Sequence, residues 1–160
     1  LAHTGVNPDR VRLEWVSAGE GIRFANIMNE YGAQVQKMGP LGTVEGIDRR
    51  ELLFNLEAAA RLVPYLKLVQ MERMRVPVRS EEAYHAFFRS EEFDRLFDEL
   101  VREKYSMSRI LLLLGERPLS TGEIAERLGL SASEVSRHVK TSARQGLVRY
   151  DVSHGRYSLA

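Results

Sequence analysis

The fold is decided by the stretch STGEIAERLGLSASEVSRHVKTSARQGLV, residues 120–148. It contains two Ser-x-x-Glu capping boxes, which begin at Ser120 and Ser131. In a capping box the serine hydroxyl accepts from the third helical amide, and the glutamate accepts from the serine's own N–H. Gly129 and Gly146 mark two helix ends, because glycine tolerates the left-handed backbone found there. The pattern predicts two short helices joined by a tight turn, which is a helix-turn-helix.

A hairpin is predicted directly after this unit. Strand-like runs over residues 147–152 and 156–159 flank Ser153-His154-Gly155, which is typical of a tight turn. The hairpin forms a wing, and the whole segment resembles the winged-helix domains of small bacterial and archaeal regulators. That resemblance is carried by the strings LSASEVSRHVK (130–140) and QGLV (145–148). We therefore expect a winged helix-turn-helix domain over residues 108–160.

The second helix of the pair presents a polar side. Val135 and Val139 fall on its core face together with Ser142, where an apolar residue is expected; its hydroxyl is expected to bond the His138 carbonyl. The opposite side carries small hydroxyls and long cations, which can reach phosphates and guanine edges. These candidate nucleic-acid or partner-binding residues are Ser133, Arg137, Lys140 and Arg144, with His154 and Arg156 on the wing.

The charge of this end leaves two alternatives open. Residues 109–160 hold eight Lys or Arg against five Asp or Glu, a net charge of +3, whereas residues 1–108 have a net charge of −2. A domain dedicated to DNA is usually more basic. The cations can therefore serve DNA binding, or they can simply solvate an exposed helix face.

A helix with an acidic outer face is predicted before the winged helix, over residues 91–105. Residues 80–105 hold eight acidic against four basic side chains, a net charge of −4. Serines 80 and 90 are predicted to cap two helices here, and Val76-Pro77-Val78 is a predicted linker. The stripe of Phe93, Leu96, Phe97, Leu100 and Val101 is expected to pack on the winged helix through Ile110, Leu111 and Leu114. The alternative is a homodimer through this helix.

An alternating segment lies near the start of the chain. Residues 10–16, RVRLEWV, place Val11, Leu13 and Trp15 on one face of a predicted strand. No other strand-like run precedes the wing, and a lone strand forms no sheet. We therefore expect an α/β domain whose other strands precede Leu1. The alternatives are that the segment docks as an edge on another protein chain, or that it is not a strand.

Helices are predicted after this segment. A capping box over residues 17–20 is expected to open a helix that ends at Gly39. Asp48 is expected to cap the next helix, and Pro64 to kink or end it.

The same region resembles a known family. The strings RLEWVSAGEG (12–21), RFANIMNE (23–30) and MGPLG (38–42) are similar to the C-terminal half of the delta subunit of methyl-viologen-reducing hydrogenases. The resemblance extends over about residues 5–75. It implies a small α/β domain with a two-iron, two-sulfur cluster on cysteines. Such a domain passes electrons from a hydrogenase or formate dehydrogenase to the flavin-containing subunit of heterodisulfide reductase.

The resemblance transfers no cluster ligand, because the chain has no cysteine. It implies that the cluster lies before Leu1 and that the supporting strand and helix help to form the partner contact. The residues expected in that contact are Glu14, Trp15, Glu20 and Arg23.

Composition narrows the remaining classes. At 160 residues and 44% apolar content, the chain fits one or two small domains. The longest aliphatic run, residues 110–114, is too short to cross a bilayer, and residues 1–4 lack the features of a signal peptide. The four histidines lack ligand spacing, and neither a nucleophile triad nor a phosphate-binding glycine loop is present. We expect no catalytic, cofactor-binding or metal-binding residue in this chain.

These observations give one expected organisation. The fold is mostly α, with a remnant of an α/β electron-transfer domain over residues 1–75, a helical linker over 76–107 and the winged helix over 108–160. The expected function is that of a cytoplasmic, non-catalytic component of a hydrogenase or heterodisulfide reductase type complex, in which the winged helix docks a partner. The alternatives are a winged-helix transcription regulator and a scaffold without activity.

Overall fold

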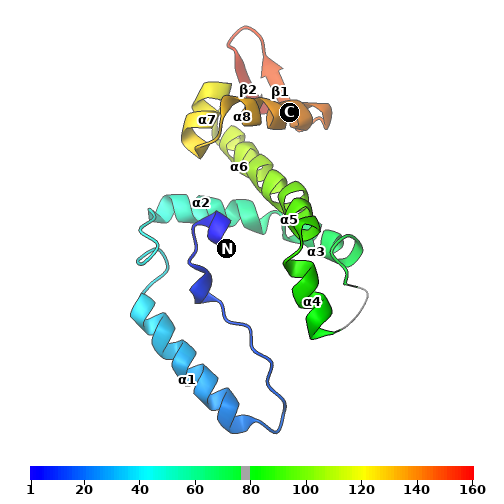
Figure 1. The fold of residues 1–160 in the computed structure, drawn as a ribbon. Coiled ribbons are helices and arrows are strands. Elements are labelled where there is room, and N and C mark those ends of the chain that lie inside the picture. Colours follow the sequence, from blue (N-terminus) through cyan, green and yellow to red (C-terminus); the bar gives the residue numbers. More distant parts are fainter. Residues whose placement is uncertain (77–79) are drawn as a thin grey trace. The chain divides into compact units, whose positions relative to one another are not determined.

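The computed structural model describes residues 1–76 and 80–160 and is mostly α-helical. The chain divides into two compact units, residues 1–56 and 57–160 (Figure 1). The division falls inside helix α2 (Arg49–Ala60).

The first unit contains two 3₁₀ turns (Ala2–Thr4 and Pro8–Arg10), helix α1 (Gly21–Met38) and most of α2. The α1 helix begins later than predicted. The Ser17 N–H donates to Glu20 Oε2 at 2.8 Å, but no side chain caps the helix. Residues 17–20 therefore form a turn before α1 and only half of the predicted capping box. The predicted cap of α2 is confirmed, because Asp48 Oδ1 accepts from the Arg50 N–H at 2.8 Å.

The strand predicted over residues 10–16 is absent. Residues 11–17 run as an irregular extended segment, drawn beside α1 in Figure 1, and no described residue pairs with them as a strand. Alternation shows which side chains share a face, but a strand also requires a hydrogen-bonded neighbour. The apolar face remains uncovered: Val11, Leu13 and Trp15 are 61%, 77% and 75% exposed.

The second unit opens with helices α3 (Val63–Glu72), α4 (Glu81–Phe88) and α5 (Glu91–Phe97). Pro64 lies in the first turn of α3, where a missing N–H breaks no helical bond, so α2 ends before it as expected. Ser80 and Ser90 cap α4 and α5 as predicted, each accepting from the third helical amide. Of the predicted linker, Pro77 and Val78 lie outside the described residues.

One continuous helical rod replaces the predicted helix over 91–105. From α5 it passes through a π-helical turn (Asp98–Arg102) into α6 (Glu103–Glu116). Its apolar stripe packs differently than predicted: Leu96 and Leu100 form a buried cluster with Val69 of α3, surrounded by Tyr65, Met74 and Phe87. The stripe therefore joins α3 to α5 instead of covering the winged helix.

The winged helix-turn-helix is confirmed. It comprises α6, α7 (Thr121–Leu128), α8 (Ala132–Arg144), β1 (Val148–Asp151) and β2 (Arg156–Leu159). Both capping boxes are complete, and Gly129 adopts a left-handed φ of 64°. β1 and β2 are antiparallel, and Leu119 exchanges two backbone hydrogen bonds with Tyr157 at 3.0 and 2.8 Å. The core of this domain contains Ile110, Ile124, Val135, Val139 and Val148.

Ser142 lies on the core face of α8, as the helical periodicity indicates, and is fully buried. The bond expected from its hydroxyl to the His138 carbonyl does not form, and Ser142 Oγ has no hydrogen-bond partner among the described residues. A buried hydroxyl without a partner lowers stability.

Candidate functional site

The outer side of α8 is arranged as the sequence predicts, since Ser133, Arg137, Lys140 and Arg144 are all exposed. Their electrostatic surroundings differ. Arg137 donates to Glu103 of α6 in a short ion pair. Within the described part of the chain, Lys140 and Arg144 have no carboxylate partner. The helix therefore offers two unpaired cations.

The wing residues also lie next to acids. Arg156 donates to the Pro118 carbonyl at 3.1 Å and to Glu123 Oε1 at 3.3 Å. His154 Nδ1 lies 2.8 Å from Asp151 Oδ2. Hydrogen bonds from the Ser153 and His154 side chains hold the pKa of Asp151 well below its usual range, so its carboxylate stays ionised.

Arg149 is a further exposed cation that the sequence analysis did not single out. Its Nε donates to Ser158 Oγ across the hairpin at 3.0 Å. The alternation of side chains along β1 is the signal that would have placed it on the surface of the wing.

These contacts weaken the positive potential of the winged helix. Glu103, Glu123 and Asp151 stand beside three of the six predicted residues: Arg137, Arg156 and His154. An acid at ion-pair distance offsets the field that a phosphate would feel. The surface of α8 and the wing therefore carries a mixture of paired and unpaired charges.

His138 projects from the opposite side of α8 and is only 4% exposed. Burial lowers the pKa of its imidazole below the ordinary 6.5, against the opposing influence of Glu103, so the neutral form dominates at pH 7. His138 belongs to the packing of the domain and does not join the exposed stripe.

The four partner-contact residues predicted in the first unit lie along the extended segment and the start of α1. Arg23 stands between Glu20, at 3.1 Å, and Glu14, at 4.0 Å. Arg12 extends this network, reaching Glu14 at 2.9 Å and Glu30 at 3.4 Å. The structure thus brings the charged members together and leaves Trp15 exposed.

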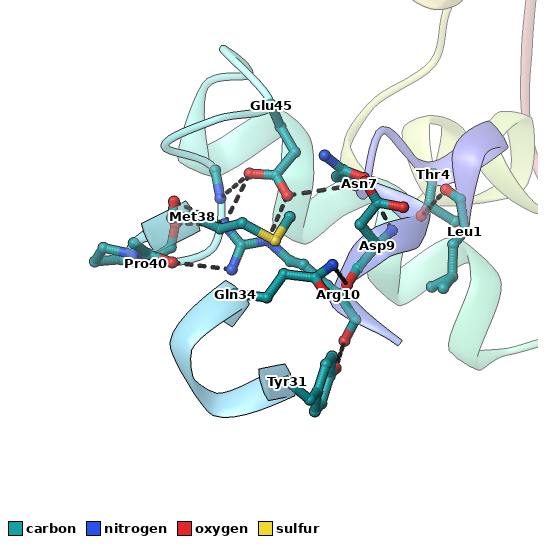
Figure 2. A network of polar contacts seen from close by, with 12 residues as sticks. Leu1, Thr4, Asn7, Asp9, Arg10, Tyr31, Gln34, Met38, Pro40 and Glu45 are labelled. Atoms are coloured by element: carbon teal, nitrogen blue, oxygen red, sulfur yellow. Dashed lines mark hydrogen bonds and ion pairs between the residues drawn. The ribbon is translucent and has the colours of Figure 1, made fainter. Parts of the chain in front are cut away.

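A second polar network in this unit was missed by sequence analysis (Figure 2). Arg10 Nε donates to Glu45 Oε1 at 2.5 Å, and the Glu45 side chain is 2% exposed. The same guanidinium donates to the carbonyls of Gly39 and Pro40, each at 2.9 Å, where α1 ends. A cation near a helix C-terminus is favoured by the helix dipole. The hydrogen bonds from Arg10 lower the pKa of Glu45 to about 2.

This Arg10–Glu45 clamp, as we call the network, connects Arg10 near the start of the chain to the C-terminal end of α1. Glu45 Oε2 also accepts from the Gly42 N–H at 2.9 Å, and the Tyr31 hydroxyl donates to the Arg10 carbonyl. Thirty-five residues separate Arg10 from Glu45, so no local spacing signals the pair.

The described residues contain no group of three or more His, Asp or Glu side chains that could hold a metal ion. None of the helices in these residues is both long enough and apolar enough to cross a membrane.

The geometry from α6 to β2 defines a winged helix-turn-helix domain, and comparison with known proteins shows which families the chain resembles. Residues 105–156 match the sequence model of the MarR family. Residues 1–39 match that of the methyl-viologen-reducing hydrogenase delta subunit. Both resemblances noted from the sequence are confirmed, although the second match ends at residue 39. No solved structure matches the chain.

Individual relatives are named as subunits of a hydrogenase or of a heterodisulfide reductase. A 40-residue stretch is 50% identical to an iron-sulfur subunit of the F420-non-reducing hydrogenase of Archaeoglobus profundus, covering 25% of this chain and 29% of that protein. A 43-residue stretch is 44% identical to a subunit of the ferredoxin/F(420)H(2)-dependent CoB-CoM heterodisulfide reductase of Methanosarcina acetivorans, covering 27% of this chain and 5% of that protein. A subunit of the ferredoxin:CoB-CoM heterodisulfide reductase of Methanosarcina mazei is 41% identical over 43 residues, with the same coverage. The chain therefore spans less than a third of these relatives.

Proposed function

We propose that this chain is part of an electron-transfer subunit in a cytoplasmic complex of the hydrogenase and heterodisulfide reductase type, and that its winged helix docks a protein partner. The observation that carries the proposal is the pairing of a hydrogenase-delta-type segment with a winged helix whose cations are partly neutralised. The expected partners are a flavin-containing heterodisulfide-reductase-type protein and a hydrogenase or formate dehydrogenase.

The chain itself carries no redox group in this proposal. It has no cysteine and therefore no thiolate for an iron–sulfur cluster. The two-iron, two-sulfur cluster would be held by cysteines outside these 160 residues. The first unit would supply a protein contact along its exposed extended segment, centred on Trp15 and bounded by the Glu14, Glu20 and Arg23 network.

DNA binding is the second candidate. It is favoured by the MarR family match and by the exposed, unpaired Lys140 and Arg144 on the second helix of the helix-turn-helix. Two features count against it. Arg137 is held by Glu103, and the acidic stretch of residues 80–105, to which Glu103 belongs, would repel phosphates.

A binding experiment tests the docking proposal. The full chain is immobilised and titrated with a purified flavin-containing heterodisulfide reductase protein, whose bound flavin reports the captured amount. We expect saturable binding that Lys140→Ala combined with Arg144→Ala weakens, while the matched Lys67→Ala and Lys37→Ala changes on α3 and α1 leave it intact. Absence of binding by the wild-type chain would contradict the proposal.

A further inference from the structure

The extended segment of the first unit is amphipathic, but its polar side faces the protein and its apolar side faces the solvent. Its polar side faces α1, where Arg12 pairs with Glu30 at 3.4 Å and Glu14 approaches Arg23 at 4.0 Å. Its apolar side carries Val11, Leu13 and Trp15, each more than 60% exposed. Exposed ion pairs therefore link the segment to α1, while its apolar side chains remain in water, where they cost free energy unless another surface covers them.

The main chain of the segment is also unpaired. Residues 12–16 form no backbone hydrogen bond with any described residue. The flanking groups are engaged: the Val11 N–H donates to the Pro8 carbonyl at 3.0 Å, and the Arg10 carbonyl accepts from Tyr31. Free donors and acceptors along an extended chain are a template for another strand.

The sequence of the segment is complementary to itself. When two copies run antiparallel about Leu13, Arg12 of one copy lies opposite Glu14 of the other, and the pair occurs twice. Val11 then lies opposite Trp15 of the second copy, also twice, and Leu13 lies opposite its own equivalent. Opposite charges and aromatic or β-branched pairs directly across two strands are stabilising. A symmetric pair of identical surfaces is the commonest arrangement of soluble homo-oligomers.

The free backbone groups select one register. With Leu13 as a non-hydrogen-bonded pair, residues 12 and 14 exchange hydrogen bonds with residues 14 and 12 of the second copy. In this register the N–H and C=O of residue 11 point away from the second strand, so the Val11 bond to Pro8 is kept. All groups that the ribbon requires are those that the structure leaves unbonded.

We propose that the segment 11–15 is a homodimerisation strand, which pairs antiparallel with the same segment of a second copy of this chain. The pairing would add contacts between the two copies on the polar side of the segment, which faces α1. On the other side of the two-stranded ribbon it would bring together six apolar side chains, three from each copy. It rests on the proposed function only in treating the surface around Trp15 as a protein contact.

Disulfide trapping tests this pairing, because the chain has no cysteine of its own. Two Leu13→Cys residues in a non-hydrogen-bonded pair would have Cα atoms about 4.5 Å apart, within the range of a disulfide. We expect the L13C variant of this 160-residue chain to form a covalent dimer under mild oxidation, roughly tenfold or more faster than the control V152C, because pairing raises the local thiol concentration. Val152 is 84% exposed in the other unit.

The register gives a second readout. Val11→Cys and Trp15→Cys variants should each remain monomeric when oxidised alone, since equivalent residues would lie roughly 14 Å apart along the strands. Mixed together, they should cross-link to a V11C–W15C heterodimer. If V11C alone cross-linked as well as the mixture of V11C and W15C, the register would be wrong. If L13C cross-linked no faster than V152C, the pairing itself would be wrong. Neither result would affect the binding of the flavoprotein or its dependence on Lys140 and Arg144. That binding experiment therefore tests the proposed function separately.

Discussion

Arg137 on the exposed side of α8 is ion-paired with Glu103 on α6, thirty-four residues earlier in the chain. The contact joins the outer face of the second helix of the helix-turn-helix to an acidic stretch of the rod that precedes it. A basic side chain held by an acid in this way is less available to a phosphate. This relationship is the main reason for preferring a protein partner over DNA.

Two buried serines should respond in opposite directions to the same change. Ser108 Oγ donates to the Ala58 carbonyl at 2.9 Å, whereas Ser142 Oγ has no partner among the described residues. We expect Ser108→Ala to lower the free energy of unfolding by about 1 kcal/mol and Ser142→Ala to raise it by about 1–2 kcal/mol. Urea unfolding followed by circular dichroism measures both. A loss of stability in S142A would show that its hydroxyl is satisfied.

Acid should weaken the second unit through His138. Burial lowers the pKa of His138 in the folded chain below the ordinary 6.5. The unfolded state therefore binds the proton more readily. The contribution of His138 to the free energy of unfolding is fully present above about pH 6.5 and falls as the pH drops toward the lower pKa of the folded chain. The change in urea midpoint between pH 8 and pH 5 should shrink in His138→Gln. An unchanged H138Q profile would refute the assignment.

The Arg10–Glu45 clamp should protect the loop after α1. Glu45→Gln removes the charge that Arg10 pairs with and weakens the contact to the Gly42 amide. We expect faster hydrogen exchange at that amide and faster proteolysis within residues 39–47, whereas Glu30→Gln at an exposed ion pair should change neither. Because the pKa of Glu45 is about 2 in the folded chain, below the ordinary 4.5, protection should be complete above pH 4.5 and decline as the pH falls toward 2. Protection that stays intact in E45Q would contradict this role.

Local signals carried most of what the sequence predicted. The caps at Ser120 and Ser131 and the left-handed Gly129 act within four residues of a helix end, so their outcome is fixed by neighbouring atoms. The outward stripe of α8 was equally readable, because periodicity alone assigns its faces.

Long-range pairings account for what the sequence did not predict. Glu103–Arg137 and Arg10–Glu45 join residues more than thirty positions apart, and no spacing rule selects them. The segment 10–16 shows the same limit: alternation indicates which residues share a face, but a strand depends on a partner from elsewhere. The packing of Leu96 and Leu100 on Val69 was unpredictable for the same reason, since an apolar stripe does not specify what covers it.

The docking role of the winged helix is tested most directly by titrating labelled duplex DNA with the full chain at low salt. The variants are wild type and Arg137→Ala/Lys140→Ala/Arg144→Ala, with fluorescence anisotropy as the readout. We expect negligible, sequence-independent binding by both. Specific submicromolar binding by the wild type would contradict the account if the triple variant bound DNA more weakly, with a salt slope smaller by up to roughly 0.9 log unit per lost phosphate contact, or did not bind it at all. The winged helix would then be a DNA-binding domain.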